Sequence, residues 1–139
     1  MEWRFTIPLE PKTKKNSGQI LINRATGKHF IAPSKAFKEY QIECGWLILK
    51  PHKPIDEPVN IKALYYMSTH RKVDLVNLHS ALHDILVHYG VVADDNSKII
   101  AATDGSRVLY DKDKPRTEVI ITSMEERGNN DLKQVKGAK

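Results

Sequence analysis

The chain has 139 residues and carries 22 Lys and Arg against 17 Asp and Glu, a net charge of +5. This length supports one domain with its own core, and the longest apolar runs, of about four residues, exclude a membrane-spanning helix, which needs about 20. One cysteine and the lack of a charged-then-apolar leader at Met1 predict a cytoplasmic protein that does not depend on disulfides.

The charge is unevenly distributed along the chain. Residues 1–54 contain ten Lys and Arg against four Glu, whereas residues 55–139 contain twelve against thirteen Asp and Glu. All nine Asp residues lie from Asp56 onward. A basic part that binds phosphates and an aspartate-rich part that holds a cation would suit a metal-dependent enzyme acting on nucleic acid.

The first half of the chain predicts three strands and a helix. Alternating apolar residues indicate a strand over 3–7 that ends at Pro8, followed by a polar, lysine-bearing loop over 11–18. Apolar residues on both sides of 24–27 predict a hairpin with a glycine at its turn. Ser34 is a suitable N-cap for a helix whose apolar spacing continues to about Leu49.

The second half predicts a strand over Val59–Met67, then a helix from Leu75 that Gly90 terminates. An acidic turn at 94–97 leads into a strand over 98–101, and residues 117–121 alternate as a last strand. These elements predict an α+β fold, a small mixed β-sheet packed with two main helices. The fold is expected to form a single domain over residues 1–122, and the polar tail of residues 123–139 is expected to be disordered.

Three aspartates are candidate metal ligands. Asp74 lies between the strand and the helix that follows it, and Asp94 and Asp95 come after that helix. A helix of about 15 residues is about 22 Å long, so these positions meet only if the chain after Gly90 doubles back along the sheet. The alternative is that Asp74 is a helix N-cap and that residues 94–97 form a solvated turn.

Two histidines and the cysteine are weaker candidates for metal binding or catalysis. His79 and His83 are four residues apart on the predicted helix, which is the spacing of a zinc pair, but the glutamate and cysteines that accompany such pairs are absent. Half-buried histidines are a common alternative. Cys44 lies on the apolar face of the first helix and is predicted to be a core residue.

Basic residues flank the acidic candidates. Lys12, Lys14 and Lys15 stand beside Asn16 in the first loop, where they either contact phosphate or only solvate the loop. Arg71 and Lys72 directly precede Asp74, so positive charge brackets the candidate metal site.

Three segments together form a recognisable motif. They are residues 71–78 (Arg-Lys-Val-Asp-Leu-Val-Asn-Leu), residues 81–86 (Ala-Leu-His-Asp-Ile-Leu), and residues 90–100, which contain Asp-Asp-Asn-Ser-Lys. They resemble the RusA-type Holliday junction resolvases of bacteria and prophages. The loop from Ile7-Pro8 to Asn16 and the strand at residues 116–119 are also similar to that family, so the resemblance spans roughly residues 3–122.

The resemblance implies a small homodimeric α+β endodeoxyribonuclease of recombination and repair. It implies that the enzyme binds four-way DNA junctions and cuts them by paired symmetric nicks with Mg²⁺, for which Mn²⁺ can substitute. Asp74, Asp94 and Asp95 fall on the family's catalytic, metal-binding positions. The residues expected to contact DNA are Lys12, Lys14, Lys15, Asn16, Arg71, Lys72, Asn77 and Lys98.

Two positions depart from the family's motif. Val76 replaces the second acid of an Asp-x-Asp pair and cannot bind a hard cation, and Ser80 replaces a lysine and cannot neutralise a phosphate. The candidate replacement ligands are Asp104, Glu118 and His79, and the candidate replacement charges are Lys72 and Lys98.

These departures leave three hypotheses. The first is the metal-dependent junction nuclease. The second is a catalytically weakened, branched-DNA-binding protein of prophage origin. The third is a phage structural or adaptor protein in which the acidic turn is only solvated surface.

Overall fold

A five-stranded mixed sheet forms the centre of the molecule, whose computed structural model describes residues 1–14, 19–32 and 34–124. Its strands are β1 (Glu2–Ile7), β4 (Val59–Met67), β5 (Ile100–Ala102), β6 (Arg107–Tyr110) and β7 (Arg116–Ser123). β7 pairs antiparallel with β1 and β4. β5 and β6 both pair with the other edge of β4 in parallel, β5 near its start and β6 near its end.

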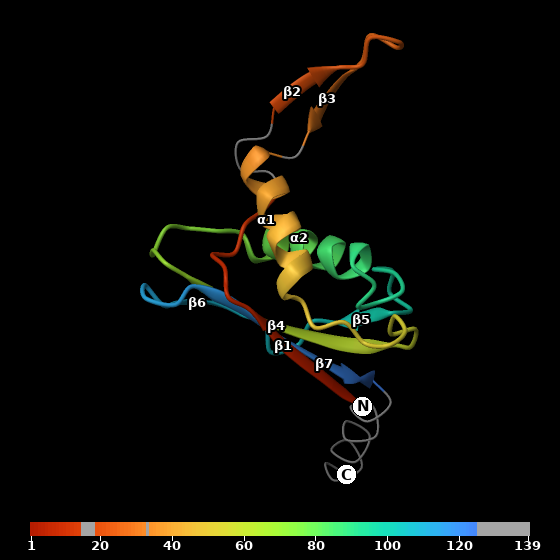
Figure 1. The fold of residues 1–139 in the computed structure, drawn as a ribbon, viewed down its shortest axis with the longest axis vertical. Coiled ribbons are helices and arrows are strands. Elements are labelled where there is room, and N and C mark those ends of the chain that lie inside the picture. Colours follow the sequence, from red (N-terminus) through yellow and green to blue (C-terminus); the bar gives the residue numbers. More distant parts are fainter. Residues whose placement is uncertain (15–18, 33, 125–139) are drawn as a thin grey trace, which may run out of the picture.

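Two helices, α1 (Lys35–Leu47) and α2 (Leu75–His88), lie on one face of this sheet (Figure 1). Ser34 caps α1 as predicted, since its hydroxyl oxygen accepts a 3.1 Å hydrogen bond from the Phe37 N–H. α1 ends at Leu47, slightly before the predicted end. α2 forms the crossover between the parallel strands β4 and β5. The predicted α+β class, with a mixed sheet and two helices, is confirmed.

The core lies between the helices and the sheet. Alternate residues of β4 and β7 are buried on this side, and α2 adds a buried apolar stripe. The largest fully buried side chains of these elements are Ile61, Tyr65, Leu78, Ile85, Leu86, Val119 and Ile121. Cys44 is also fully buried, which confirms the prediction that it is a core residue.

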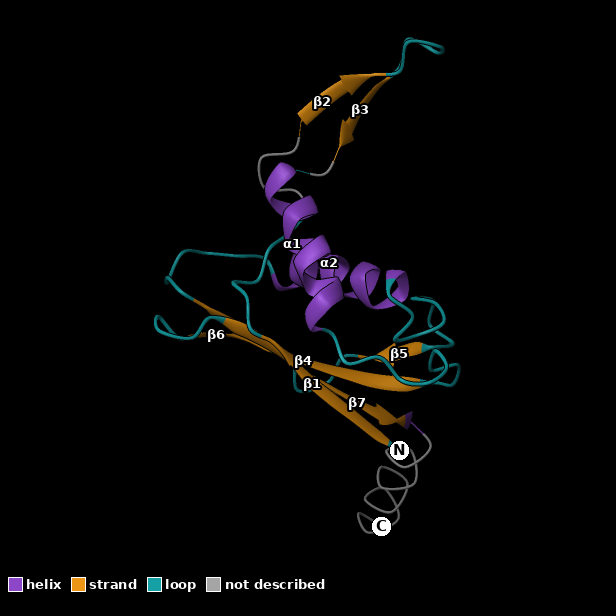
Figure 2. Ribbon diagram, viewed as in Figure 1, coloured by secondary structure: helices purple, strands orange, loops and turns teal. Residues whose placement is uncertain are grey.

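The predicted hairpin is formed by β2 (Gln19–Ile22) and β3 (His29–Ala32), which pair antiparallel. Gly27 has a φ of 69° in its turn, a conformation that glycine adopts without strain. The hairpin stands away from the sheet and helices as a separate arm (Figure 2).

Three features differ from the sequence-based expectations. β5 covers residues 100–102 rather than 98–101, and β6 was not predicted. β7 runs through Ser123, one residue into the predicted tail, and residues 125–139 of that tail lie outside the described part of the chain. Neither α1 nor α2, the helices of the described residues, is long and apolar enough to cross a membrane.

Candidate functional site

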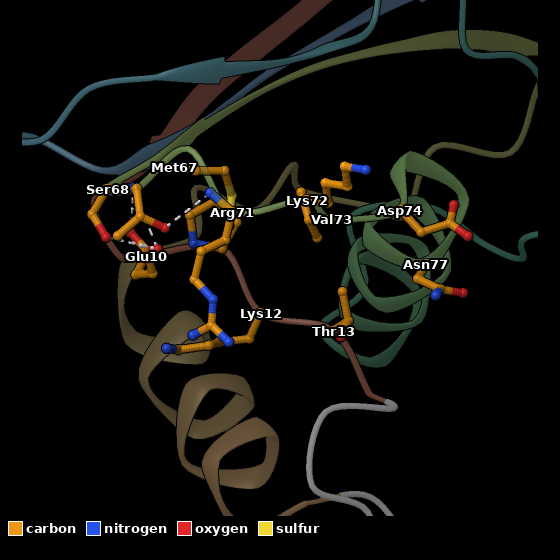
Figure 3. Close-up of a pocket in the computed structure, with 12 residues that line it drawn as sticks. Glu10, Lys12, Thr13, Met67, Ser68, Arg71, Lys72, Val73, Asp74 and Asn77 are labelled. Atoms are coloured by element: carbon orange, nitrogen blue, oxygen red, sulfur yellow. Dashed lines mark hydrogen bonds between the residues drawn. The ribbon is translucent and has the colours of Figure 1, made fainter.

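A pocket of about 630 Å³ opens where β4 ends (Figure 3). Three segments line it: the loop after β1, the loop after β4 and the first turn of α2. Its lining residues are Glu10, Pro11, Lys12, Thr13, Met67, Ser68, Thr69, Arg71, Lys72, Val73, Asp74 and Asn77. The pocket therefore brings together predicted DNA-binding and metal-binding residues from two distant parts of the sequence.

Glu10 fixes one wall of this pocket. Its carboxylate accepts hydrogen bonds from the Ser68 backbone N–H at 3.0 Å and from the Ser68 hydroxyl at 2.9 Å. These bonds hold the loop after β1 against the end of β4. Sequence reasoning missed Glu10, because no local pattern connects it with a residue 58 positions away.

Positive charge predominates in the pocket. Lys12, Arg71 and Lys72 are exposed, and none of them forms an ion pair with another described residue. Figure 3 shows the Lys12 and Arg71 side chains extending to the same side of the pocket. Because the Glu10 carboxylate is already hydrogen-bonded, these cations are available to an external anion such as a DNA phosphate.

Asp74 is the N-cap of α2. Its Oδ1 accepts a 2.9 Å hydrogen bond from the Val76 N–H, and its backbone is extended, with φ −85° and ψ 119°. The alternative interpretation of Asp74 as a helix cap is thus confirmed. The cap engages one carboxylate oxygen, and no described residue donates a hydrogen bond to Oδ2; Asn77 lies nearby on the first turn of the helix (Figure 3).

Asp94 and Asp95 lie in an exposed turn. The Asp94 carboxylate accepts hydrogen bonds from the Asp95 N–H at 2.7 Å and from the Asn96 side-chain amide at 3.0 Å. These hydrogen bonds lower the pKa of Asp94, the Asp95 N–H having the largest effect, so this carboxyl group is charged at neutral pH. In the same turn, the Lys98 N–H donates to the Asn96 side chain.

The two acidic positions lie at opposite ends of α2. The segment after α2 is held near the start of β4, because the Ile55 N–H donates to Val91 O at 2.9 Å and the Val59 N–H donates to Ile99 O at 2.8 Å. Asp74 follows the other end of β4. α2 has 14 residues and is therefore about 21 Å long.

The chain therefore does not double back within one copy. No three His, Cys, Asp or Glu side chains of the described residues form a group that could hold a metal ion. The structure does not bring Asp74 together with Asp94 and Asp95 in a single chain, and their assignment as ligands stays a prediction.

The other described residues predicted to contact DNA do not line the pocket. The Lys14 ammonium group is ion-paired with the Asp84 carboxylate of α2. Lys98 lies in the turn of Asp94, away from the pocket. Lys15 and Asn16 lie outside the described residues.

His79 and His83 stack with ring centroids 5.4 Å apart and an angle of 7° between the planes. His79 Nδ1 is hydrogen-bonded to the hydroxyl group of buried Tyr65 at 2.7 Å. His83 Nε2 is buried and has no hydrogen-bond partner among the described residues. The pair thus packs against the core, and the described residues supply no third ligand that would complete a zinc site.

Two of the candidate replacement ligands, Glu118 and Asp104, lie outside the pocket. Glu118 is on the sheet face opposite the helices, since its neighbours Thr117 and Val119 are buried on the helix side, and it lies 3.6 Å from the Arg116 guanidinium. Asp104 lies in the turn between β5 and β6, where its N–H donates to the Asn60 side chain at 2.7 Å.

Comparison with known families adds one result. The family model for endodeoxyribonuclease RusA matches residues 8–122, a range that includes the pocket and both acidic positions. No curated protein matches the chain.

Proposed function

The chain belongs to the RusA family of endodeoxyribonucleases, and we propose that it cuts four-way DNA junctions by paired symmetric nicks with Mg²⁺. The predicted resemblance is confirmed by the match over residues 8–122, and the family acts on Holliday junctions. The observation that carries the proposal is the basic pocket built by the matched residues.

In this proposal the pocket binds the DNA backbone. Lys12, Arg71 and Lys72 supply three positive charges that no described side chain neutralises. Asn77, on the first turn of α2, adds hydrogen-bonding groups at the pocket's edge. Phosphate contacts of this kind position a protein on DNA without reading the sequence.

The carboxylates suit Mg²⁺ by their chemistry. Asp74 and Asp95 offer hard oxygen donors, which are the ligands Mg²⁺ prefers. A bound Mg²⁺ would activate water and stabilise the charge that develops on the phosphate. Within one chain these donors are separated by the length of α2, so the described residues of one copy do not assemble a complete site.

We propose that a second copy of the chain completes the site. Asp74 of one copy would then act together with Asp94 and Asp95 of the other. A four-way junction needs two equivalent cuts, and a two-fold dimer built in this way carries two such sites.

The C-terminal half of α1 offers a surface for this second copy. Ile42 and Trp46 are exposed on this part of the helix and Leu49 is exposed just after it, and the Trp46 side chain is 86% accessible to solvent. Large apolar side chains gathered on a surface are typical of protein interfaces. Trp46→Glu should lower the molecular mass in sedimentation from that of a dimer to that of a monomer, and an unchanged mass would contradict this placement of the interface.

A cleavage assay tests the proposed function. The protein is incubated with a labelled four-way junction with Mg²⁺, with Mn²⁺ and with chelator, beside Asp95→Asn and the control Asp113→Asn, which alters an exposed aspartate between β6 and β7. The native protein and the control should make paired nicks with either metal, and Asp95→Asn should bind but not cut. Cutting that persists in chelator would contradict the metal requirement.

Val76 and Ser80 favour a second candidate, a branched-DNA-binding protein with weakened catalysis. Val76 is 71% exposed at the position where the family's second acid is expected, so the described residues supply no carboxylate there. The same assay separates the two candidates: junction binding without cutting in Mg²⁺ or Mn²⁺ identifies the binding protein.

A further inference from the structure

Two aromatic rings stack beside the segments that line the basic pocket. His70, in the loop after β4, lies against Tyr110, the last residue of β6, with ring centroids 3.7 Å apart and an angle of 26° between the planes. Tyr110 is the register partner of Met67, and the Asp111 N–H donates to Met67 O at 2.8 Å. Met67 and Arg71 line the pocket, so the stacked pair is next to lining residues in sequence and in register, although neither ring lines the pocket itself.

Both stacked residues are partly open to solvent. Tyr110 is 44% exposed, and His70 is exposed as well. Neither side chain hydrogen-bonds to another described residue. β6 is an edge strand, so no further described strand covers this side of the sheet. The part of the pair that the described residues leave uncovered offers an aromatic surface to a ligand.

The charge around the rings differs from that around another aromatic of the sheet. On the opposite face, the Arg116 guanidinium lies 3.8 Å from the centre of the Tyr66 ring and is ion-paired with Asp111 at 2.8 Å. That ring is covered and that cation is neutralised. Beside His70, in contrast, Arg71 and Lys72 have no ion-pair partner among the described residues.

We propose that the His70–Tyr110 pair stacks against a DNA base at the branch point while the pocket binds the adjacent phosphates. This inference rests on the proposed function and adds a determinant of specificity to it. Stacking on an aromatic ring accepts any base, because every base has a π-face. It requires a base with an open face, which a continuous duplex does not offer but a strand leaving the branch point can. The pair would therefore favour branched DNA over linear duplex.

Binding measurements with ring substitutions test the inference. The native protein, Tyr110→Leu, Tyr110→Phe and the control Val108→Ala are titrated, without metal, against a four-way junction and a linear duplex across a range of salt concentrations. Val108 is exposed two residues earlier on the same strand and face, and it has no ring. Tyr110→Leu should bind the junction about tenfold more weakly and the duplex equally well. Tyr110→Phe and Val108→Ala should bind both DNAs like the native protein.

The salt dependence separates stacking from phosphate binding. Tyr110→Leu should lower junction affinity by the same factor at every salt concentration, whereas loss of a phosphate contact makes the slope of log affinity against log salt shallower. A changed slope would overturn the inference. His70→Leu is a second variant that removes the other ring of the pair, and it should have the same effect on binding. It replaces Tyr110→Leu as the test if that variant does not fold.

A fluorescent base gives an independent readout. With 2-aminopurine placed next to the branch point, emission should change when the native protein binds and should not change when Tyr110→Leu binds at saturation. Equal junction affinities together with equal emission changes would overturn the inference and leave the proposed function intact. A native protein that does not prefer the junction to the duplex would overturn both.

Discussion

The Glu10 carboxylate accepts hydrogen bonds from both the backbone N–H and the hydroxyl group of Ser68, at 3.0 Å and 2.9 Å. The bonds join the loop after β1 to the loop after β4. Lys12 is two residues from Glu10, and Arg71 is three residues from Ser68. One carboxylate thus holds together the two segments that present the cations of the pocket.

Ser68→Ala should weaken this connection without changing the charge of the pocket. A hydrogen bond to a charged group contributes about 1.5–3 kcal/mol, so the free energy of unfolding in urea should fall by about that amount. Ser97→Ala, in the exposed acidic turn, is the matched control and should change stability by less than about 0.5 kcal/mol. Equal stabilities of the two variants would show that the Glu10–Ser68 contact does not hold the loops together.

The lysines of the first loop should differ in their contribution to DNA binding. Lys12→Ala should reduce the slope of log affinity against log salt by about one for each pocket that binds DNA, because each pocket loses a free cation. Lys14→Ala should change the slope less, because its ammonium group is already paired with Asp84. Junction titrations from about 50 to about 200 mM salt measure both slopes.

Asp84→Asn is the complementary change. It releases Lys14, so the slope should become steeper, and adding Lys14→Ala to this variant should reverse the gain. If Lys14→Ala has as large an effect as Lys12→Ala in the native background, the ion pair does not restrain Lys14.

His83 should make stability depend on pH. Burial, and next the charge of His79, lowers the pKa of His83 to about 4, although Asp84 acts in the opposite direction. The unfolded chain takes up a proton on this ring below about pH 6.5, whereas the folded chain does so only near pH 4. Stability should therefore be full above about pH 6.5 and fall by up to roughly 3 kcal/mol as the pH drops toward 4. Burial lowers the pKa of His79 in the same direction.

His83→Phe should reduce this loss, as measured by urea unfolding near pH 7 and about pH 4.5. His52→Phe alters an exposed histidine and should keep the native pH dependence. If His83→Phe and the native protein lose the same stability over this range, the buried ring is not the cause.

Val76→Asp should restore the acid that the family's motif contains. Val76 is 71% exposed and lies in the first turn of α2. An aspartate at this position would not bury its charge, and it would interact favourably with the helix dipole. We expect a lower half-saturating Mg²⁺ concentration for nicking and weaker junction binding in metal-free buffer. Ser80→Asp, one turn further along α2, adds the same charge and should leave the Mg²⁺ requirement unchanged. An Mg²⁺ requirement that stays the same or rises in Val76→Asp would indicate a site built from different ligands.

Local patterns predicted much of the fold correctly. The alternation of Val59–Met67 predicts β4 with its observed bounds, and the apolar spacing after Asp74 predicts α2. These signals are strong because each element buries one face. β6 gave no comparable signal: it has four residues, most of them exposed, and it is held by parallel pairing with β4 more than 40 residues away.

The candidate site was less predictable, since its geometry depends on contacts between distant segments. The motif identified Asp74, Arg71 and Lys72, which do line one pocket. It did not indicate that Glu10 closes that pocket, nor that β5 pairs near the start of β4 and so keeps Asp94 and Asp95 at the far end of α2. The sequence predicted the length of the helix, but not the course of the chain after Gly90, which decides whether the carboxylates meet.

We propose that two copies of the chain share their carboxylates to cut a four-way junction. This sharing is tested most directly by co-expressing Asp74→Asn with Asp95→Asn under different tags and measuring Mg²⁺-dependent nicking by the purified mixed dimer. Each variant alone should be inactive. In the mixed dimer one site carries both substitutions and the other carries none, so nicking of single strands should return at about half the native capacity per dimer. A mixed dimer as inactive as either variant, under conditions in which the native protein cuts, would contradict the shared site.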